Sequence, residues 1–342
     1  MNERRTLIVA GVGPVPVGNP GRVYAPGLRL YAFSKILHES GFRVIMGEAA
    51  FAGKQEALPT AGAGVPWEHR VLPFDVRSAA PILRQWIHSD RPEAVITTTD
   101  VMNLASAMAG EGVPRWMDFN GHPMVERQEL SRVHSCDDGL ADQWNQVLPS
   151  LLAGDHFSTC STPQKYALIG ELGAVGRLNR FTSGHDLVTS IPPGPVFHEG
   201  KPTGIPALRG RLYPENAFCL LWNGGFNTWV DEEMLFKGVE AAMIREERLH
   251  FLLTGGAIEG HDESTFVRFQ ERVNGSPVRS RFHFCGWVPL EHLPDYYAAA
   301  DAAINLDRFS YEALLGCRNR LFSWIRFGLP VIPLRRVSEE AA

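Results

Sequence analysis

The chain has 342 residues, of which 44% are hydrophobic and 21% are charged, and its formal net charge is −5. A chain of this length is more than one hydrophobic core usually serves, so we expect two domains. The acidic balance and the lack of a block of basic residues argue against nucleic acid as a partner, because a phosphate backbone requires a concentrated basic face.

The cysteines and the N-terminal residues indicate the cellular compartment of the protein. The five cysteines are scattered, and no two of them form a Cys-x-x-Cys pair. This usage favours a reducing compartment. The apolar stretch after Arg5 is too short for a secretory signal, and no run approaches the ~20 apolar residues of a membrane span. We therefore expect a cytoplasmic protein.

Short apolar segments alternate with amphipathic segments through the first half of the chain. We predict strands at 6–10, 42–46, 94–98, 115–119 and 155–160, and helices around 30–37, 81–88, 140–151 and 162–173. Ser161 and Pro163 are typical of a helix start, because a hydroxyl caps the first turn and proline is tolerated in it. Alternation at this spacing predicts a parallel sheet with helices on its faces.

The composition changes between Ser190 and Glu215, where prolines and glycines replace the periodic pattern. Such a segment is typical of a connector between domains. After it, we predict strands at 218–222, 250–254, 282–285, 302–306 and 329–334, and helices around 235–242, 293–300 and 321–327. The sequence thus predicts an N-terminal Rossmann-like domain (1–190), a linker (191–215) and a C-terminal Rossmann-like domain (216–342).

Glycines follow three predicted strands of the second half, at Gly224-Gly225, Gly255-Gly256 and Gly286. Ligands of open α/β sheets gather beyond the carboxyl ends of the strands. Glycine lets the backbone approach a ligand there, and a following helix N-terminus presents N–H groups to phosphate. A single Gly-Gly pair is more often an ordinary turn, but three glycine turns at successive strand ends favour a binding site.

A second feature is the segment that holds Glu312, Arg318 and Arg320, just before the last predicted helix. The planar fork of arginine suits phosphate, and glutamate suits sugar or ribose hydroxyls. Because the two arginines are two residues apart, they would converge only if the chain from Gly316 is partly loop. A solvated, charged helix end explains the spacing equally well.

His122 is the histidine that we single out in the first half. It follows the predicted strand 115–119 within Asn-Gly-His-Pro, and Glu126 comes close behind it. A lone histidine is more often structural than catalytic. Other classes are disfavoured because Gly11-x-Gly13 lacks the third glycine of a dinucleotide fingerprint, and no Walker A, Gly-x-Ser-x-Gly or His-Glu-x-x-His motif is present. These absences weaken the dehydrogenase, NTPase, hydrolase and metalloprotease hypotheses.

Several segments, taken in order, resemble a known family. Residues 222–231 (WNGGFNTWVD) are similar to its W-G-G-G-x-x-x-W-x-D stretch, and 284–289 with 296–301 to its F-x-G-W-V-P and Y-x-x-A-D motifs. Residues 317–320 with 327–331 are similar to its F-R-T-R and A-G-L-P-V ending, and 25–29 (APGLR) to its Gly-x-Arg start of the first helix. The segment 155–176 is similar to the stretch before the family's linker. The family is the retaining GT-B glycosyltransferases of glycosyltransferase family 4.

This resemblance implies an α/β fold of the GT-B type, in which two Rossmann-like parallel-sheet domains face each other across a cleft. It implies a donor site that binds a nucleotide-diphosphate sugar. The nucleotide base would contact Gly286, Trp287 and Val288. The diphosphate would contact Gly224, Gly225, Arg318 and Arg320. It makes Glu312 and His122 the catalytic candidates, and it places Arg29, His122 and Glu126 along the acceptor side.

The resemblance also implies the chemistry. The sugar would pass with retention to a glycan, lipid-linked or small-molecule acceptor. Neither a metal nor another cofactor would be needed, because basic groups and helix dipoles stabilise the leaving diphosphate. A lipid-linked acceptor would bring the protein into peripheral contact with the inner face of the membrane.

Two departures from the family pattern keep alternatives open. Ser323 stands where the family has a second acidic residue, and the family continues after 331 with a further strand–helix unit and a closing helix. We therefore expect an incomplete second domain. A non-catalytic relative that binds a nucleotide sugar or a glycan is the first alternative, and a GT-B sugar-nucleotide epimerase is the second.

Overall fold

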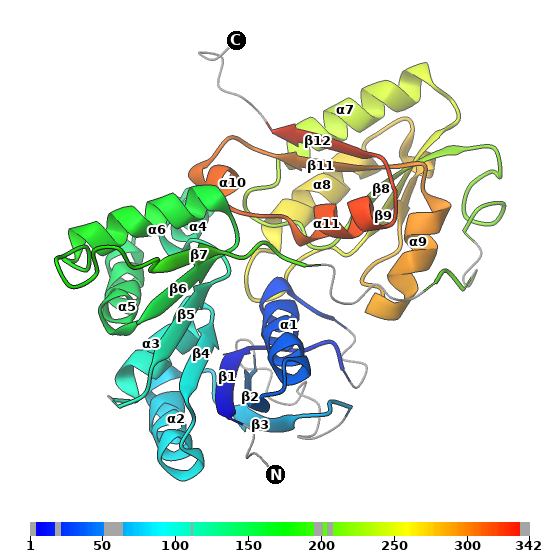
Figure 1. Cartoon of the computed structure of the whole chain (residues 1–342). Helices are drawn as coiled ribbons and strands as arrows, with labels where there is room; N and C mark the ends of the chain where they lie inside the picture. The colour runs from blue at the N-terminus through cyan, green and yellow to red at the C-terminus, as the bar shows by residue number, and fades with distance from the viewer. Residues whose placement is uncertain are drawn as a thin grey trace. The chain divides into compact units, whose positions relative to one another are not determined.

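The computed structural model describes residues 5–17, 22–50, 64–110, 112–194, 201–203 and 208–335. The chain divides into two compact units, the first comprising Met1–Pro193 with Leu315–Cys317 and the second Gly194–Leu314 with Arg318–Ala342. Each unit is built on one parallel sheet (Figure 1). The predicted α/β class with two Rossmann-like parallel sheets is confirmed.

The first unit contains a sheet with the strand order β3-β2-β1-β4-β5-β6-β7 within the described residues. Its strands are β1 (Thr6–Val12), β2 (Arg43–Ala49), β3 (Glu68–Leu72), β4 (Ala94–Thr98), β5 (Arg115–Phe119), β6 (His156–Thr159) and β7 (Val188–Ser190). Its helices are α1 (Ala25–Glu39), α2 (Val76–Asp90), α3 (Asp100–Met108), α4 (Pro123–His134), α5 (Leu140–Ala153) and α6 (Thr162–Ala174).

Successive side chains of β1 point to opposite faces of the sheet, and a hydrophobic core lies on each face. Val9 packs with Leu30 and other side chains of the α1 side, whereas Ile8 packs with Leu83 and the side chains of α2 and α3. Successive side chains of a strand point to opposite faces, so one strand serves both layers. At the start of α6, Ser161 accepts a hydrogen bond from the backbone N–H of Gln164 (3.1 Å), as expected of the predicted cap.

The second unit contains a parallel sheet with the strand order β10-β9-β8-β11-β12. Its strands are β8 (Phe218–Asn223), β9 (Leu249–Thr254), β10 (Phe282–Phe284), β11 (Ala302–Asp307) and β12 (Val331–Arg335). Its helices are α7 (Glu232–Arg245), α8 (Ser264–Asn274), α9 (Leu293–Ala299), α10 (Tyr311–Leu315) and α11 (Asn319–Arg326). Leu208 and Tyr213, from the predicted linker, are buried in the core of this unit.

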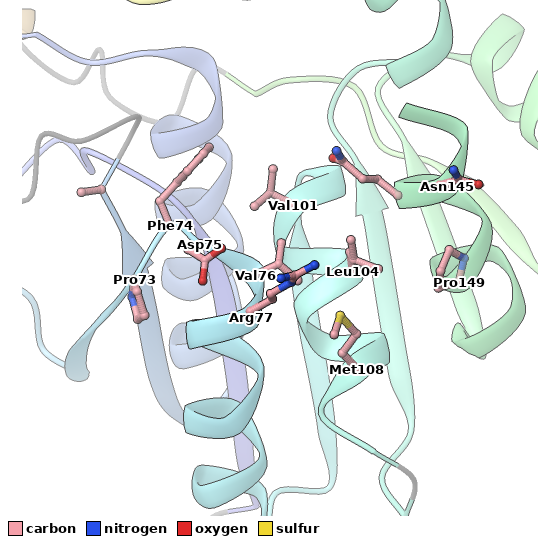
Figure 2. Close-up of a pocket in the computed structure, with 12 residues that line it drawn as sticks. Pro73, Phe74, Asp75, Val76, Arg77, Val101, Leu104, Met108, Asn145 and Pro149 are labelled. Atoms are coloured by element: carbon pink, nitrogen blue, oxygen red, sulfur yellow. The ribbon is translucent and has the colours of Figure 1, made fainter. Parts of the chain in front are cut away.

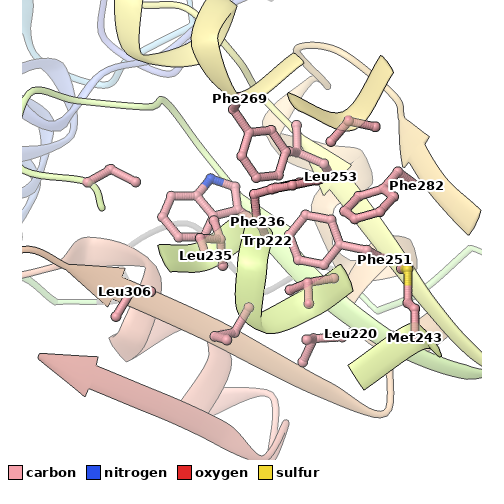
Figure 3. Packing of buried hydrophobic residues seen from close by; sticks show 14 of the residues in the cluster. Leu220, Trp222, Leu235, Phe236, Met243, Phe251, Leu253, Phe269, Phe282 and Leu306 are labelled. Atoms are coloured by element: carbon pink, nitrogen blue, oxygen red, sulfur yellow. The ribbon is translucent and has the colours of Figure 1, made fainter. Parts of the chain in front are cut away.

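Aromatic side chains fill the core between this sheet and helices α7 and α8 (Figure 3). The rings of Phe251 and Phe282 lie 5.7 Å apart, and Phe269 lies 6.2 Å from Phe251. Trp222 of β8 is fully buried in the same cluster. Full burial of one such side chain contributes about 1.5–3 kcal/mol, so this layer fixes the strands whose ends carry the site. Within the described ranges, every helix is too short or too polar to cross a lipid bilayer.

A pair of histidines joins the strands β9 and β10 of the second sheet. His250 Nδ1 lies 2.9 Å from His283 Nε2, and the rings stack with 5.2 Å between their centroids. Burial, together with the neighbouring His250, lowers the pKa of His283 to about 4. In the unfolded chain His283 has the ordinary histidine pKa of about 6.5. As the pH falls, it is therefore protonated in the unfolded chain before it is protonated in the folded one.

We expect this pair to make the second unit sensitive to acid. The stability that depends on neutral His283 is complete above about pH 6.5 and is lost as the pH falls towards 4, because the folded state resists protonation. Between pH 7 and pH 4.5, the free energy of unfolding of His283→Gln should therefore fall by about 1–2 kcal/mol less than that of the wild type. Urea unfolding at the two pH values measures the difference. His134→Gln, on the exposed end of α4, is the control, and equal acid losses for His283→Gln and wild type would contradict the expectation.

Candidate functional site

The three predicted glycine turns lie together at the carboxyl ends of β8, β9 and β10. Gly224, Gly255 and Gly286 all have positive φ, at 100°, 92° and 67°. The backbone N–H of Gly255 donates to the carbonyl oxygen of Gly286 (2.6 Å), and a Cβ on Gly255 would overlap the carbonyl oxygen of Gly224. Residue 255 must therefore be glycine for the strand ends to approach this closely.

Trp287 and Val288, predicted at the nucleotide base, lie in different surroundings. The indole Nε1 of Trp287 donates to the carbonyl oxygen of Ala257 (3.2 Å), and a Cβ added to Gly225 would lie 3.6 Å from the far edge of this indole. Trp287 therefore lies beside the glycine turns. Val288 instead is partly buried against the hydrophobic cluster that contains Tyr296 and Tyr297.

Arg318 is buried and held by two carboxylates. Its Nε donates to Asp307 Oδ2 (2.9 Å), and its Nη1 and Nη2 donate to the two oxygens of Glu312 (2.8 and 2.5 Å). The guanidinium also lies 4.9 Å from the ring centroid of Trp229. Burial alone would lower the pKa of Arg318, but Glu312 and Asp307 outweigh it and raise that pKa. Both predicted residues, Arg318 and Glu312, are thus engaged with each other.

Arg320 is held differently. Residues 316–318 lie outside the helices and α11 begins at Asn319, so the two arginines can converge on one region. Arg320 Nη2 donates to the carbonyl oxygen of Gly225 (3.0 Å), and the guanidinium stacks 4.4 Å from the ring centroid of Trp222. Burial lowers the pKa of Arg320 to about 10, which leaves it charged at neutral pH.

The charge of Arg320 is incompletely compensated. Its Nη1 is buried and has no hydrogen-bond partner among the described residues. A buried N–H donor of a charged group is costly when it has no acceptor. An anionic group placed beside Gly224 and Gly225 would provide that missing partner, and the glycine turns leave backbone rather than side chains at this position.

In the first unit, Arg29 bridges α1 and the sheet. Its Nε and Nη2 donate to the two oxygens of Asp118 in β5 (3.0 and 2.7 Å), and its Nη1 donates to the carbonyl oxygen of Ile191 (2.7 Å). Ser158 donates to the same carboxylate (2.5 Å). Burial opposes the charge of Arg29, but Asp118 outweighs burial and raises the pKa of Arg29. Arg29 is therefore a buried anchor of the predicted acceptor side.

His122 immediately precedes α4, makes no side-chain cap hydrogen bond, and lies near a carboxyl group from α6. Its Nε2 lies 3.4 Å from Glu171 Oε1, and its Nδ1 is buried without a partner in the described part of the chain. Burial lowers the pKa of His122 and raises that of Glu171 to about 7. The carboxylate of Glu126 lies instead against the Cα of Gly121. His122 and Glu126 belong to the first unit, and Glu312 belongs to the second.

Two partners in these clusters were not predicted from the sequence: Asp118 and Glu171. Asp307 directly follows the predicted strand 302–306 and was expected among the strand-end residues, but its pairing with Arg318 was not predicted. Glu171 has a local signal, because it is a single carboxylate in an otherwise apolar helix, YALIGELGA. Asp118 lies near the end of an apolar strand, where a charge is unusual and requires a partner. That position could have been identified on this basis.

A pocket in the first unit lies apart from these residues (Figure 2). It has a volume of about 930 Å³ and lies among α2, α3 and α5, with Phe74, Val101, Leu104 and Met108 in its wall. None of the predicted site residues lines it. Its size therefore gives no reason to move the candidate site away from the strand ends.

The fold matches solved structures at low sequence identity. A sucrose-phosphate synthase from Thermosynechococcus elongatus is 15% identical with a TM-score of 0.70, covering 96% of this chain and 81% of that one. HepE from Anabaena, solved with UDP-glucose, is 15% identical with a TM-score of 0.62, covering 96% and 80%. An α,α-trehalose 6-phosphate synthase from Burkholderia multivorans is 9% identical with a TM-score of 0.64, covering 97% and 84%.

These likenesses show that the chain has the GT-B fold. No family model matches the chain, and no curated protein matches its sequence. The likeness is therefore one of fold, and the activity has to be argued from the site.

Proposed function

We propose that this protein transfers a sugar from a nucleotide-diphosphate donor to an acceptor hydroxyl. The observation that carries the proposal is the half-buried, charged Arg320, whose buried Nη1 has no partner among the described residues and which lies beside the Gly224-Gly225 turn. Backbone turns and an arginine at the carboxyl ends of parallel strands form a binding site for phosphate. The diphosphate of the donor is the anion that we assign to it.

The chemistry follows from the charge that the leaving group develops. As the bond between the sugar and the diphosphate breaks, negative charge grows on the diphosphate oxygens, and a fixed cation in a buried site stabilises that charge. Arg320 supplies this stabilisation directly. The resemblance to glycosyltransferase family 4 supports retention of configuration and an activity that does not require a metal. A UDP-sugar is the first donor to test, because HepE, of the same fold, was solved with UDP-glucose.

Calorimetric titration with UDP-, GDP- and ADP-glucose tests the proposal. We expect one of the three to bind with a Kd below about 1 mM, the upper end of ordinary substrate affinities. An assay for released nucleoside diphosphate, with candidate acceptors present, then measures turnover. Failure of all three donors to bind at about 1 mM would refute the proposed donor site.

A non-catalytic relative that binds a nucleotide sugar is the second candidate. Both oxygens of Glu312 accept hydrogen bonds from Arg318, and Ser323 stands at the position where the family has an acidic residue. A carboxylate engaged in this way is less available to a sugar. Donor binding without any release of diphosphate, across a panel of acceptors, would favour this second function over transfer.

A further inference from the structure

The loop that follows α6, residues 176–182, exposes two large apolar side chains to solvent. Phe181 is 75% exposed and Leu178 is 50% exposed, and Leu152, at the end of α5, is 52% exposed. Among the large hydrophobic side chains of the described residues, Phe181 is the most exposed. Large apolar side chains that are exposed together on one surface are typical of an interaction site.

The loop is held in this shape by its own hydrogen bonds. Asn179 accepts from the backbone N–H of Phe181 (2.9 Å) and donates to the carbonyl oxygen of Gly176 (3.0 Å). The Thr182 hydroxyl accepts from the backbone N–H of Asn179 (3.0 Å) and donates to the carbonyl oxygen of Arg177 (2.6 Å). The exposure of Phe181 is therefore built into the loop, because its backbone has little freedom to fold the ring inward.

Basic side chains accompany the apolar ones. The Arg180 guanidinium lies 4.5 Å from the ring centroid of Phe181, and Arg180 is itself exposed. Arg177 donates through Nη1 to the carbonyl oxygens of Leu151 and Leu152 (3.1 and 2.6 Å), which holds the loop against the end of α5. Within a chain of net charge −5, this tip joins exposed apolar side chains to an exposed cation.

We propose that the 176–182 loop inserts Phe181 and Leu178 into the surface of an anionic lipid bilayer, with Arg180 at the level of the headgroups. Aromatic and aliphatic side chains beside arginine suit the boundary between headgroups and acyl chains. The exposed apolar area is on the order of 300 Å², whereas a stable protein partner requires about 800 Å² on each side. A small tip therefore fits a soft lipid surface better than a second protein.

The position of the loop agrees with this role. The loop leads into the first residue of β7, and β5, β6 and β7 are parallel. It therefore lies at the amino-terminal edge of the first sheet, at the outer end of α6 (Figure 1). His122 follows the carboxyl end of β5, at the opposite edge of the same sheet. Insertion of the loop leaves the predicted acceptor side uncovered, and the proposal does not depend on the proposed function.

Co-sedimentation of the full chain with lipid vesicles tests the proposal. We expect binding to phosphatidylcholine vesicles that contain phosphatidylglycerol, weaker binding to pure phosphatidylcholine, and loss of the difference at high salt. Phe181→Ser should reduce binding by about fivefold or more, and Arg180→Glu should abolish the preference for anionic vesicles. Asn179→Ala removes no apolar side chain but frees the loop, so it should also weaken binding.

Ile244→Ser is the matched control, because Ile244 is 61% exposed on α7 of the second unit and lies on no part of this loop. It should bind vesicles as the wild type does, and circular dichroism should show every variant folded. A wild-type chain that stays in the supernatant with both kinds of vesicle would overturn the proposal, as would wild-type binding by Phe181→Ser. Self-association that Phe181→Ser abolishes would assign the loop to a second copy of the chain and would equally overturn it.

Discussion

Replacing Arg318 by methionine should destabilise the second unit by about 3–5 kcal/mol, which is the cost of removing one partner from a buried ion pair. Glu312 and Asp307 are 3% and 7% exposed, and both lose the cation that holds them. Urea unfolding of the wild type and the variant measures the loss.

A triple variant provides the control for this prediction. Arg318→Met combined with Glu312→Gln and Asp307→Asn removes the cation and both negative charges, so it should recover most of the stability lost by the single variant. If Arg318→Met alone unfolds within about 1 kcal/mol of the wild type, the three side chains do not form the stabilising cluster described above. In that case Arg318 would be available to a ligand.

Replacing Arg320 by alanine should weaken the binding of a nucleoside diphosphate by about 10- to 100-fold, the effect of one charge-assisted hydrogen bond. The change breaks no hydrogen-bonded ion pair, because Arg320 donates to the carbonyl oxygen of Gly225 rather than to a carboxylate. Stability should therefore change far less than in Arg318→Met. Calorimetric titration with the donor that binds the wild type measures the affinity.

The two arginines of α11 allow a matched comparison. Arg326→Ala removes an exposed arginine from the same helix and should leave the affinity for the donor unchanged. Arg320→Lys keeps the charge and should lose only part of that affinity. An affinity equal to that of the wild type in Arg320→Ala would remove this residue from the donor site. The sequence alone treats Arg318 and Arg320 as equivalent, but their contacts separate a structural arginine from an available one.

The positions of most strands along the chain, and the glycine turns at the strand ends, were accessible from the sequence, because apolar runs and glycines are local signals. Some elements were missed for physical reasons. Helix α3 places polar side chains in the core, since Asn103 bonds to Thr97 and to the carbonyl oxygen of Asp118, and this obscures its amphipathic pattern. Helix α8 carries Phe269 and Val273 on a buried stripe, so its signal was present and was overlooked.

The pairing of side chains in the site could not be predicted in the same way. Asp307 and Arg318 are brought together only when β11 and the start of α11 pack in the same unit. His122 and Glu171 come from α4 and α6, which are separated along the chain by α5 and β6. No local spacing rule contains such contacts. The sequence could therefore identify which groups line the strand ends, but not which of them neutralise one another.

The stacking of Arg320 on Trp222 also gives the protein an optical reporter. An indole 4.4 Å from a guanidinium, in a fully buried site, emits in the electric field of that cation. An anion that pairs with Arg320 changes this field without entering the aromatic core. The fluorescence emission of Trp222 therefore reports occupancy of the proposed phosphate position. Comparison with Trp222→Phe identifies the part of the total tryptophan fluorescence that comes from Trp222. The arrangement that leaves Arg320 open to a ligand thus makes its binding visible without a label.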